Sequence, residues 1–64
     1  MANYTASGLR ALPLADLFDL ELSTGHTVAA LEQAHKWREA DQADADYRLV
    51  RRIRREKNGS EVQG

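Results

Sequence analysis

The sequence predicts an all-α fold, a helical hairpin with a short first helix and a long or kinked second helix. Three observations predict it. Apolar residues recur at helical spacing, long stretches hold good helix formers without Gly or Pro, and no stretch alternates apolar and polar residues as a half-buried strand does. The 64 residues are too few for a second domain, so we expect one small helical domain over 1–64 with frayed ends at about 1–7 and 59–64.

The first helix is predicted over residues 13–22. Pro13 suits a first helical position, because its missing N–H group needs no partner there. Gly25 favours chain reversal, so a turn is predicted over Ser23–His26. Four apolar residues fall at i, i+3, i+4 and i+8 and define one face of this helix: Leu14, Leu17, Phe18 and Leu22.

The second helical stretch is predicted from Thr27, a suitable N-cap, to Lys57, before the stop signal Asn58–Gly59. Along this stretch the apolar stripe rotates by about 150° between Trp37 and Ile53, at about 100° per residue. A straight helix packed on one neighbour keeps its stripe on one side. Either the helix breaks or kinks within residues 41–46, where a break would give three helices, or it uses different faces for different partners; we favour a break or kink.

A shortage of core predicts association with another chain. So small a domain gains only about 3–5 kcal/mol from its own core, and without cysteine it has neither a disulfide nor a thiolate zinc site to add. We therefore expect a homodimeric bundle or docking on a larger protein. The predicted interface comprises eight apolar residues on two faces: Leu14, Leu17, Phe18, Leu31 and Trp37 on one, and Tyr47, Val50 and Ile53 on the other.

Catalytic and metal motifs are missing from the sequence. There is no nucleophile elbow, glycine-rich phosphate loop or paired general acid and base, so we predict no enzyme activity, cofactor or small-molecule substrate. Glu32 and His35 form a Glu-x-x-His pair of the kind that helical di-iron sites use. On a helical wheel the pair lies off the stripe that should face a bundle centre, so we expect a solvated pair and no metal.

The charges fall into two blocks of opposite sign. Residues 1–47 carry a formal charge of −5 and residues 48–57 a charge of +5. The basic block is interpreted in three ways: a solvated face, a phosphate-binding face, or a face for an acidic protein surface, including that of a second copy. No interleaved aromatic or Asn/Gln residues accompany the arginines, as base reading would require. The nucleic-acid-binding candidates are Arg48, Arg51, Arg52 and Arg55.

Charged residues interrupt the leucines of the N-terminal third, and no signal-peptide core follows the first residues. We therefore expect a cytoplasmic protein without a membrane partner. The predicted function is that of a non-enzymatic interaction or regulatory protein that dimerises or docks a helical face onto a larger protein. The alternative is a small nucleic-acid-binding regulator that uses the arginine-rich helix.

Overall fold

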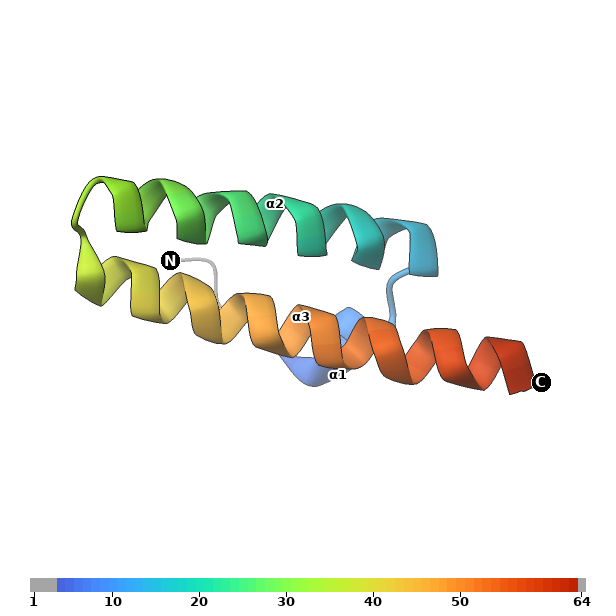
Figure 1. The fold of residues 1–64 in the computed structure, drawn as a ribbon. Coiled ribbons are helices and arrows are strands. Elements are labelled where there is room, and N and C mark those ends of the chain that lie inside the picture. The colour runs from blue at the N-terminus through green and yellow to red at the C-terminus, as the bar shows by residue number, and fades with distance from the viewer. Residues whose placement is uncertain (1–3, 64) are drawn as a thin grey trace.

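The computed structural model describes the backbone of residues 4–63 and the side chains of residues 4–59, and this part of the chain forms three helices (Figure 1). They are α1 (Ala6–Arg10), α2 (Leu14–Gln33) and α3 (Trp37–Gln63). The all-α prediction is confirmed. α2 and α3 lie side by side and antiparallel, and α1 packs on α3 (Figure 1). The molecule is elongated, with extents of 43 × 17 × 13 Å.

α1 is a single short helix that begins within the N-terminal segment expected to be frayed. Thr5 caps it: the backbone N–H of Gly8 donates to Thr5 Oγ1 at 3.1 Å, which satisfies one of the free donors of the first turn. Its buried residue is Leu9. The Thr5 cap and the buried Leu9 explain why a helix begins in this segment, for which the polar composition predicted a frayed end.

α2 begins one residue after its predicted start, and it does not end at residue 22. Pro13 is the N-cap and Leu14 the first helical residue, and the helix then continues through the predicted turn Ser23–His26 to Gln33. The hydroxyl of Thr24 donates to the carbonyl of Leu20 at 2.7 Å, so this buried polar group is satisfied within the helix. The predicted turn is therefore wrong.

Gly25 remains helical because of its neighbour on α3. It has no positive φ, and a Cβ built on it would lie 3.3 Å from Cε1 of Tyr47. The glycine thus lets the tyrosine ring approach the α2 backbone. A glycine inside this helix is therefore explained by tertiary packing, which local helix stop signals do not reflect.

The turn between α2 and α3 lies at Ala34–Lys36 and is a Schellman motif. The N–H of His35 donates to the carbonyl of Glu32 at 3.0 Å, and the N–H of Lys36 donates to the carbonyl of Leu31 at 2.9 Å. His35 has φ of 59°, the left-handed conformation that glycine usually supplies at this position. His35 is therefore a turn residue, and the expectation that it lies on one helix with Glu32 is wrong; both side chains are exposed.

α3 is one uninterrupted helix, so the break favoured within residues 41–46 is wrong. Ala40 is buried near its start, and Val50 and Ile53 are buried further along. α3 also continues past Asn58–Gly59, where we predicted its end.

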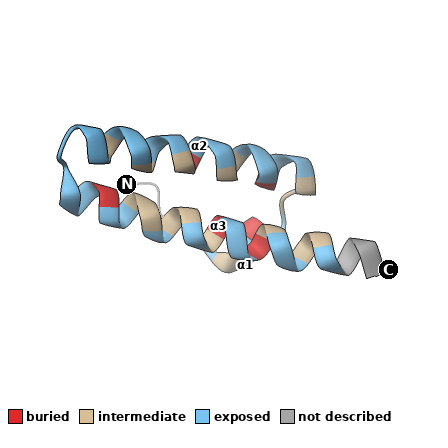
Figure 2. Ribbon diagram, viewed as in Figure 1, coloured by how far each residue is buried: buried red, intermediate tan, exposed pale blue. Residues whose placement is uncertain are grey.

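The hydrophobic core is small and lies where all three helices meet (Figure 2). Around it pack partly buried side chains from α1, α2, α3 and the connecting segments. Each described helix contributes to the buried cluster, which consists of Leu9, Leu17, Val50 and Ile53. α2 is ten residues longer than predicted, and α1 adds a third helix. Together they cover Val50 and Ile53 of α3, whereas Trp37 at the start of α3 stays exposed.

Candidate functional site

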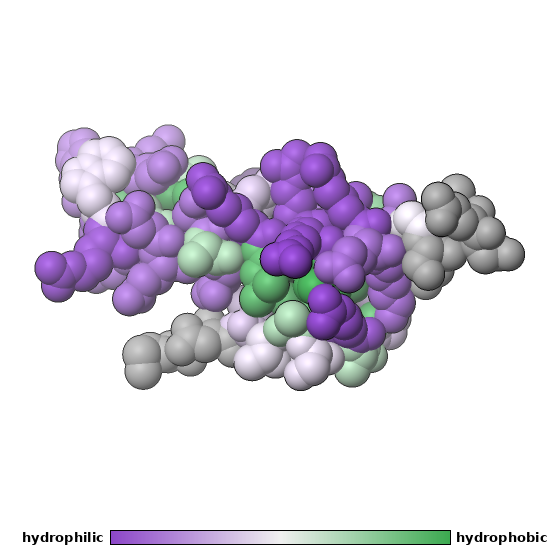
Figure 3. All heavy atoms as spheres, turned by 90° about the horizontal axis from the view of Figure 1, so that it is seen from below, coloured by the Kyte–Doolittle hydropathy of each residue, from purple (hydrophilic) through white to green (hydrophobic). Residues whose placement is uncertain are grey.

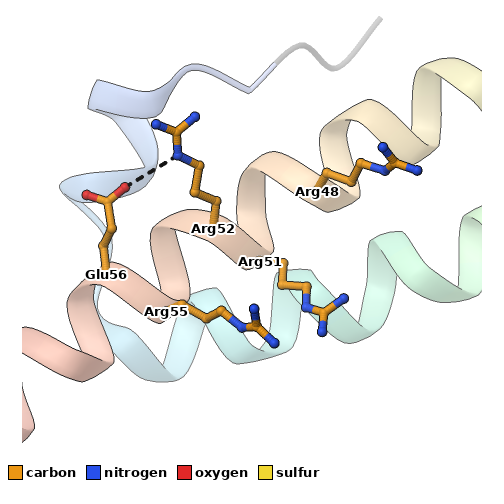
Figure 4. A pocket seen from close by; sticks show the side chains of 5 residues that line it. All are labelled: Arg48, Arg51, Arg52, Arg55 and Glu56. Carbon is orange, nitrogen blue, oxygen red and sulfur yellow. Dashed lines mark ion pairs between the residues drawn. The ribbon is translucent and has the colours of Figure 1, made fainter.

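Four arginines lie together on one side of α3. Arg48, Arg51, Arg52 and Arg55, here called the arginine face, are all exposed and, with Glu56, line a shallow hollow of about 520 Å³ (Figure 4). Their side chains fan out from α3, with Arg51 and Arg55 pointing in the same direction (Figure 4). The structure thus brings together all four residues that the charge pattern singled out.

Only part of this positive charge is neutralised. Arg48 Nε lies 2.9 Å from Asp44 Oδ2, and Arg52 Nε lies 3.8 Å from Glu56 Oε2. Both arginine side chains are more than three-quarters exposed, so these pairs are weak and exchange readily with other anions. Arg51 and Arg55 have no ion-pair partner among residues 4–59. The arginine face therefore has guanidinium groups available for an anionic ligand.

Arg54, the fifth arginine of the block, has a structural position instead. Its Nε lies 2.6 Å from Glu21 Oε1 and its Nη2 lies 3.2 Å from Glu21 Oε2, while its guanidinium carbon lies 5.0 Å from the centre of the Phe18 ring. The hydrogen bond to Arg54 lowers the pKa of Glu21. Both charged side chains are mostly buried, so Arg54 holds α3 to α2 and is unavailable to a ligand.

Lys57 is engaged in a similar way at the α1–α2 connection. Its Nζ donates to the carbonyl of Leu12 at 2.6 Å and to that of Arg10 at 3.4 Å. Arg10 is the last residue of α1, and Leu12 lies in the connection that leads to Pro13. Sequence reasoning did not find these two structural cations, because their partners lie more than 30 positions away in the chain.

Most of the surface seen from below is hydrophilic. Hydrophobic side chains show mainly near the middle of this view, with smaller areas elsewhere between hydrophilic side chains (Figure 3). The N-terminal half of α3 is acidic, with Glu39, Asp41, Asp44 and Asp46. α3 therefore carries opposite charges in its two halves.

The eight predicted interface residues divide into three groups. Leu17, Val50 and Ile53 belong to the chain's own core, with at most 1% of their surface exposed. The prediction that they lie on a free interface is therefore wrong. Leu14, Leu31 and Tyr47 are half-buried. Phe18 and Trp37 are 43% and 59% exposed.

Leu22 is the most exposed large hydrophobic residue of the described chain, at 66%, and it was missing from the predicted interface. It was assigned to the apolar face of the first helix. Its position on the wheel, at the edge of the Leu14–Leu17–Phe18 stripe, was the available signal that it points away from the helix pair.

Two kinds of feature, metal-binding groups and membrane-spanning helices, are absent from the described residues. Residues 4–59 hold no group of three or more His, Cys, Asp or Glu side chains placed to bind a metal ion. No described helix combines the length and apolar character that crossing a membrane requires. His26, expected in the inter-helix turn, is instead an exposed residue of α2.

Comparison with known proteins adds no functional assignment. The chain matches no protein-family model, and neither a curated protein nor a solved structure matches it.

Proposed function

We propose that this protein is a small non-enzymatic interaction protein whose arginine face binds the phosphate backbone of nucleic acid. One observation carries the proposal: four exposed guanidiniums surround one shallow hollow that contains a single carboxylate, and two of the four have no ion-pair partner among residues 4–59. Guanidinium groups bind phosphate oxygens through two parallel hydrogen bonds.

The shape of α3 suits a duplex. An α-helix with its side chains is about 10–12 Å wide, close to the about 12 Å width of the major groove of B-DNA. From Arg48 to Arg55 the face extends about 10 Å along the helix. α1 and α2 pack on the side of this segment that carries the buried Val50 and Ile53, and the four arginines on its outer side are exposed.

Binding of this kind contacts the backbone and does not read bases. The arginine face has no aromatic residue for stacking and no Asn or Gln for adenine. The acidic half of α3 repels phosphate, so only the C-terminal half approaches the duplex. We infer an affinity independent of base sequence and strongly dependent on salt.

The test is fluorescence anisotropy of a short labelled duplex titrated with the protein. Neutralising four phosphates predicts that affinity falls about 100-fold between about 50 and about 200 mM salt. Replacing Arg51→Ala together with Arg55→Ala should abolish most of the binding and reduce the salt slope by about two phosphates. The matched control is Lys36→Ala with Arg38→Ala, two exposed basic residues outside the face, which removes the same charge.

Two outcomes would overturn the proposal. One is an unchanged anisotropy at about 50 mM salt. The other is equal weakening by the two double variants, which would mean that net charge and not the arginine face determines binding. Polyglutamate is the competitor that distinguishes ligand classes: if it binds as tightly as the duplex, the face recognises an acidic protein surface instead.

Docking to a larger protein is a second candidate function, favoured by Trp37. This side chain is 59% exposed, and the His35 ring lies 5.7 Å from it between centroids. Exposed tryptophans are over-represented among the residues that contribute most to binding. A protein with this function would ignore the duplex in the same titration, and Trp37→Asp would release the partner while leaving the helix content unchanged.

A further inference from the structure

The outer side of α3 carries a row of residues at the spacing of a seam between two packed helices. The intervals along the row are four, three, four, three and four residues, so its members lie within about 80° of one another at about 100° per residue. The buried Val50 and Ile53 lie on the opposite side of the helix. The row, here called the α3 seam, consists of Trp37, Asp41, Asp44, Arg48, Arg51 and Arg55.

The α3 seam is accessible, and much of its charge is unpaired. Trp37 is 59% exposed, and Asp41, Arg51 and Arg55 are exposed as well. These three charged side chains have no ion-pair partner among residues 4–59. The two central residues of the seam pair with each other at 2.9 Å, and the guanidinium side chain of that pair is 79% exposed. Figure 4 shows the guanidinium half of the seam.

Charge changes sign once along the seam, so the seam is complementary to itself in the antiparallel direction. About a two-fold axis level with residue 46, Asp41 lies opposite the partner's Arg51, because the two positions are equally far from the axis. Asp44 lies opposite the partner's Arg48 for the same reason. A carboxylate has two oxygen atoms, so Asp44 can accept from the partner's guanidinium while it keeps its own.

The two ends of the seam match in the same pairing. Trp37 lies opposite the partner's Arg55, and a guanidinium is attracted to the face of an indole ring. Because a two-fold axis repeats every contact, each residue of the seam meets a group of complementary chemistry on the other copy.

Other alignments of two seams set like charges against each other. A parallel pairing places each aspartate on the same aspartate of the partner. Sliding the antiparallel pairing by one heptad sets Asp41 against the partner's Asp44 in one direction and Arg48 against the partner's Arg51 in the other. Charge therefore selects one register.

One flank of the seam brings a further arginine to the contact. Arg38 lies level with the partner's Arg52 and Glu56. Those two residues form an ion pair with each other within one chain, so the flank presents a carboxylate together with the guanidinium. The flank adds no uncompensated repulsion.

We propose that a second copy of this chain docks antiparallel on the α3 seam, with Asp41 of each copy bound to the partner's Arg51. Exposed ion pairs contribute little individually, so the dimer is weak, with a dissociation constant of about 1 mM at low salt. The dimer covers Arg51 and Arg55 of the arginine face. A second copy and a nucleic-acid backbone therefore exclude each other, a consequence that rests on the proposed function.

Sedimentation equilibrium at about 1 mM protein and about 20 mM salt tests the dimer. About half of the wild-type chains should be dimeric, and the fraction should fall at about 200 mM salt, where screening weakens exposed pairs. Asp41→Lys should weaken the dimer at least about tenfold, because each lysine then faces the partner's Arg51.

Glu39→Lys is the matched control. Glu39 is exposed in the same half of α3 but lies on the side opposite the seam, and the substitution changes net charge by the same amount. This variant should dimerise like the wild type. A monomeric wild type at low salt, an Asp41→Lys variant that dimerises as well as the wild type, or equal weakening by Glu39→Lys would each overturn the proposal.

A mixture of two variants tests the register. Arg51→Glu alone should weaken the dimer as Asp41→Lys does, because two carboxylates then meet. An equimolar mixture of the two variants should associate to within about threefold of the wild type, since each new lysine faces a new glutamate and the unchanged pair stays intact. A mixture that associates no better than either variant would contradict the pairing of positions 41 and 51.

Far-ultraviolet circular dichroism verifies that each variant is folded. If Arg51→Glu does not fold, the comparison of Asp41→Lys with Glu39→Lys decides the proposal by itself, because both substitutions leave every arginine in place.

The duplex titration keeps this inference apart from the proposed function. Asp41→Lys retains the whole arginine face and removes a carboxylate that repels phosphate, so it should bind the duplex at least as tightly as the wild type. A chain that binds the duplex but never dimerises would contradict the contact between copies alone. A chain that dimerises but ignores the duplex would contradict the proposed function alone.

Discussion

Arg54 and Glu21, 33 residues apart in the sequence, form a two-bond ion pair between α3 and α2, with Nε–Oε1 at 2.6 Å and Nη2–Oε2 at 3.2 Å. The Phe18 ring lies beneath the guanidinium, whose carbon is 5.0 Å from the ring centre. Arg54 thus holds α3 to α2, whereas the four arginines of the arginine face remain exposed.

The ion pair predicts a specific pH dependence of stability. Hydrogen bonding to Arg54 lowers the pKa of Glu21 in the folded state, so the folded chain binds the proton less readily than the unfolded chain does. The resulting stabilisation is fully present above the ordinary carboxyl pKa and is lost as the pH falls through the lowered folded-state pKa. We expect Glu21→Gln to reduce the free energy of unfolding by about 1–2 kcal/mol at pH 7.

Urea unfolding of the wild type and of Glu21→Gln at neutral and acidic pH measures this effect. The difference between the two proteins should shrink as the wild-type carboxylate becomes protonated. A difference that stays constant down to about pH 2–3, which is about one unit or more below the ordinary carboxyl pKa, would mean that the charge of Glu21 contributes nothing to stability.

The substitution His35→Gly should stabilise the fold. Its φ of 59° places a residue with a Cβ in the left-handed region, where glycine has no steric cost. His35→Gly should therefore raise the free energy of unfolding by about 0.5–1 kcal/mol, despite the loss of the ring contact with Trp37. Thermal unfolding followed by circular dichroism gives the result; a lower midpoint for His35→Gly would contradict the Schellman turn.

The close approach of the Tyr47 ring to Gly25 should be visible in a double-mutant cycle. An alanine in the interior of an exposed helix is usually about 1 kcal/mol more stable than a glycine. Here the new Cβ would lie 3.3 Å from the Tyr47 ring, so Gly25→Ala should gain little in the wild type and more in a Tyr47→Ala background.

Gly59→Ala is the control for this cycle, because a Cβ at that position meets no atom within 4 Å. Its effect on the urea midpoint should be the same with and without Tyr47. If Gly25→Ala is equally stabilising in both backgrounds, the close approach of the ring carries no energetic weight.

Substitutions of Ile53 should unfold the chain and not merely separate it from another chain. It is 1% exposed and lies in the core with Leu17 and Val50. Ile53→Ala should cost about 2–5 kcal/mol, and Ile53→Asp should unfold the chain. Loss of helical circular dichroism at every protein concentration is expected for Ile53→Asp; a folded monomer would instead place Ile53 at an interface between chains.

The amino-acid sequence by itself determined the helical class, the start of α2 after Pro13, and the basic segment of α3 that carries the arginine face. These features depend on local properties: helical periodicity, a missing N–H group and a concentration of charge. The four arginines of the face could be named from the sequence because exposed charged residues keep their pattern whatever packs beneath them.

The tertiary structure decided where the helices end and which apolar residues are free. Gly25, the aspartates of residues 41–46 and Asn58–Gly59 are stop signals worth about 1 kcal/mol each, which packing between helices outweighs. The turn falls at His35, a residue that takes the left-handed conformation more readily than most others with a side chain. The contacts of Glu21 with Arg54 and of Gly25 with Tyr47 join residues far apart in the chain, so only the packing of α2 on α3 shows them.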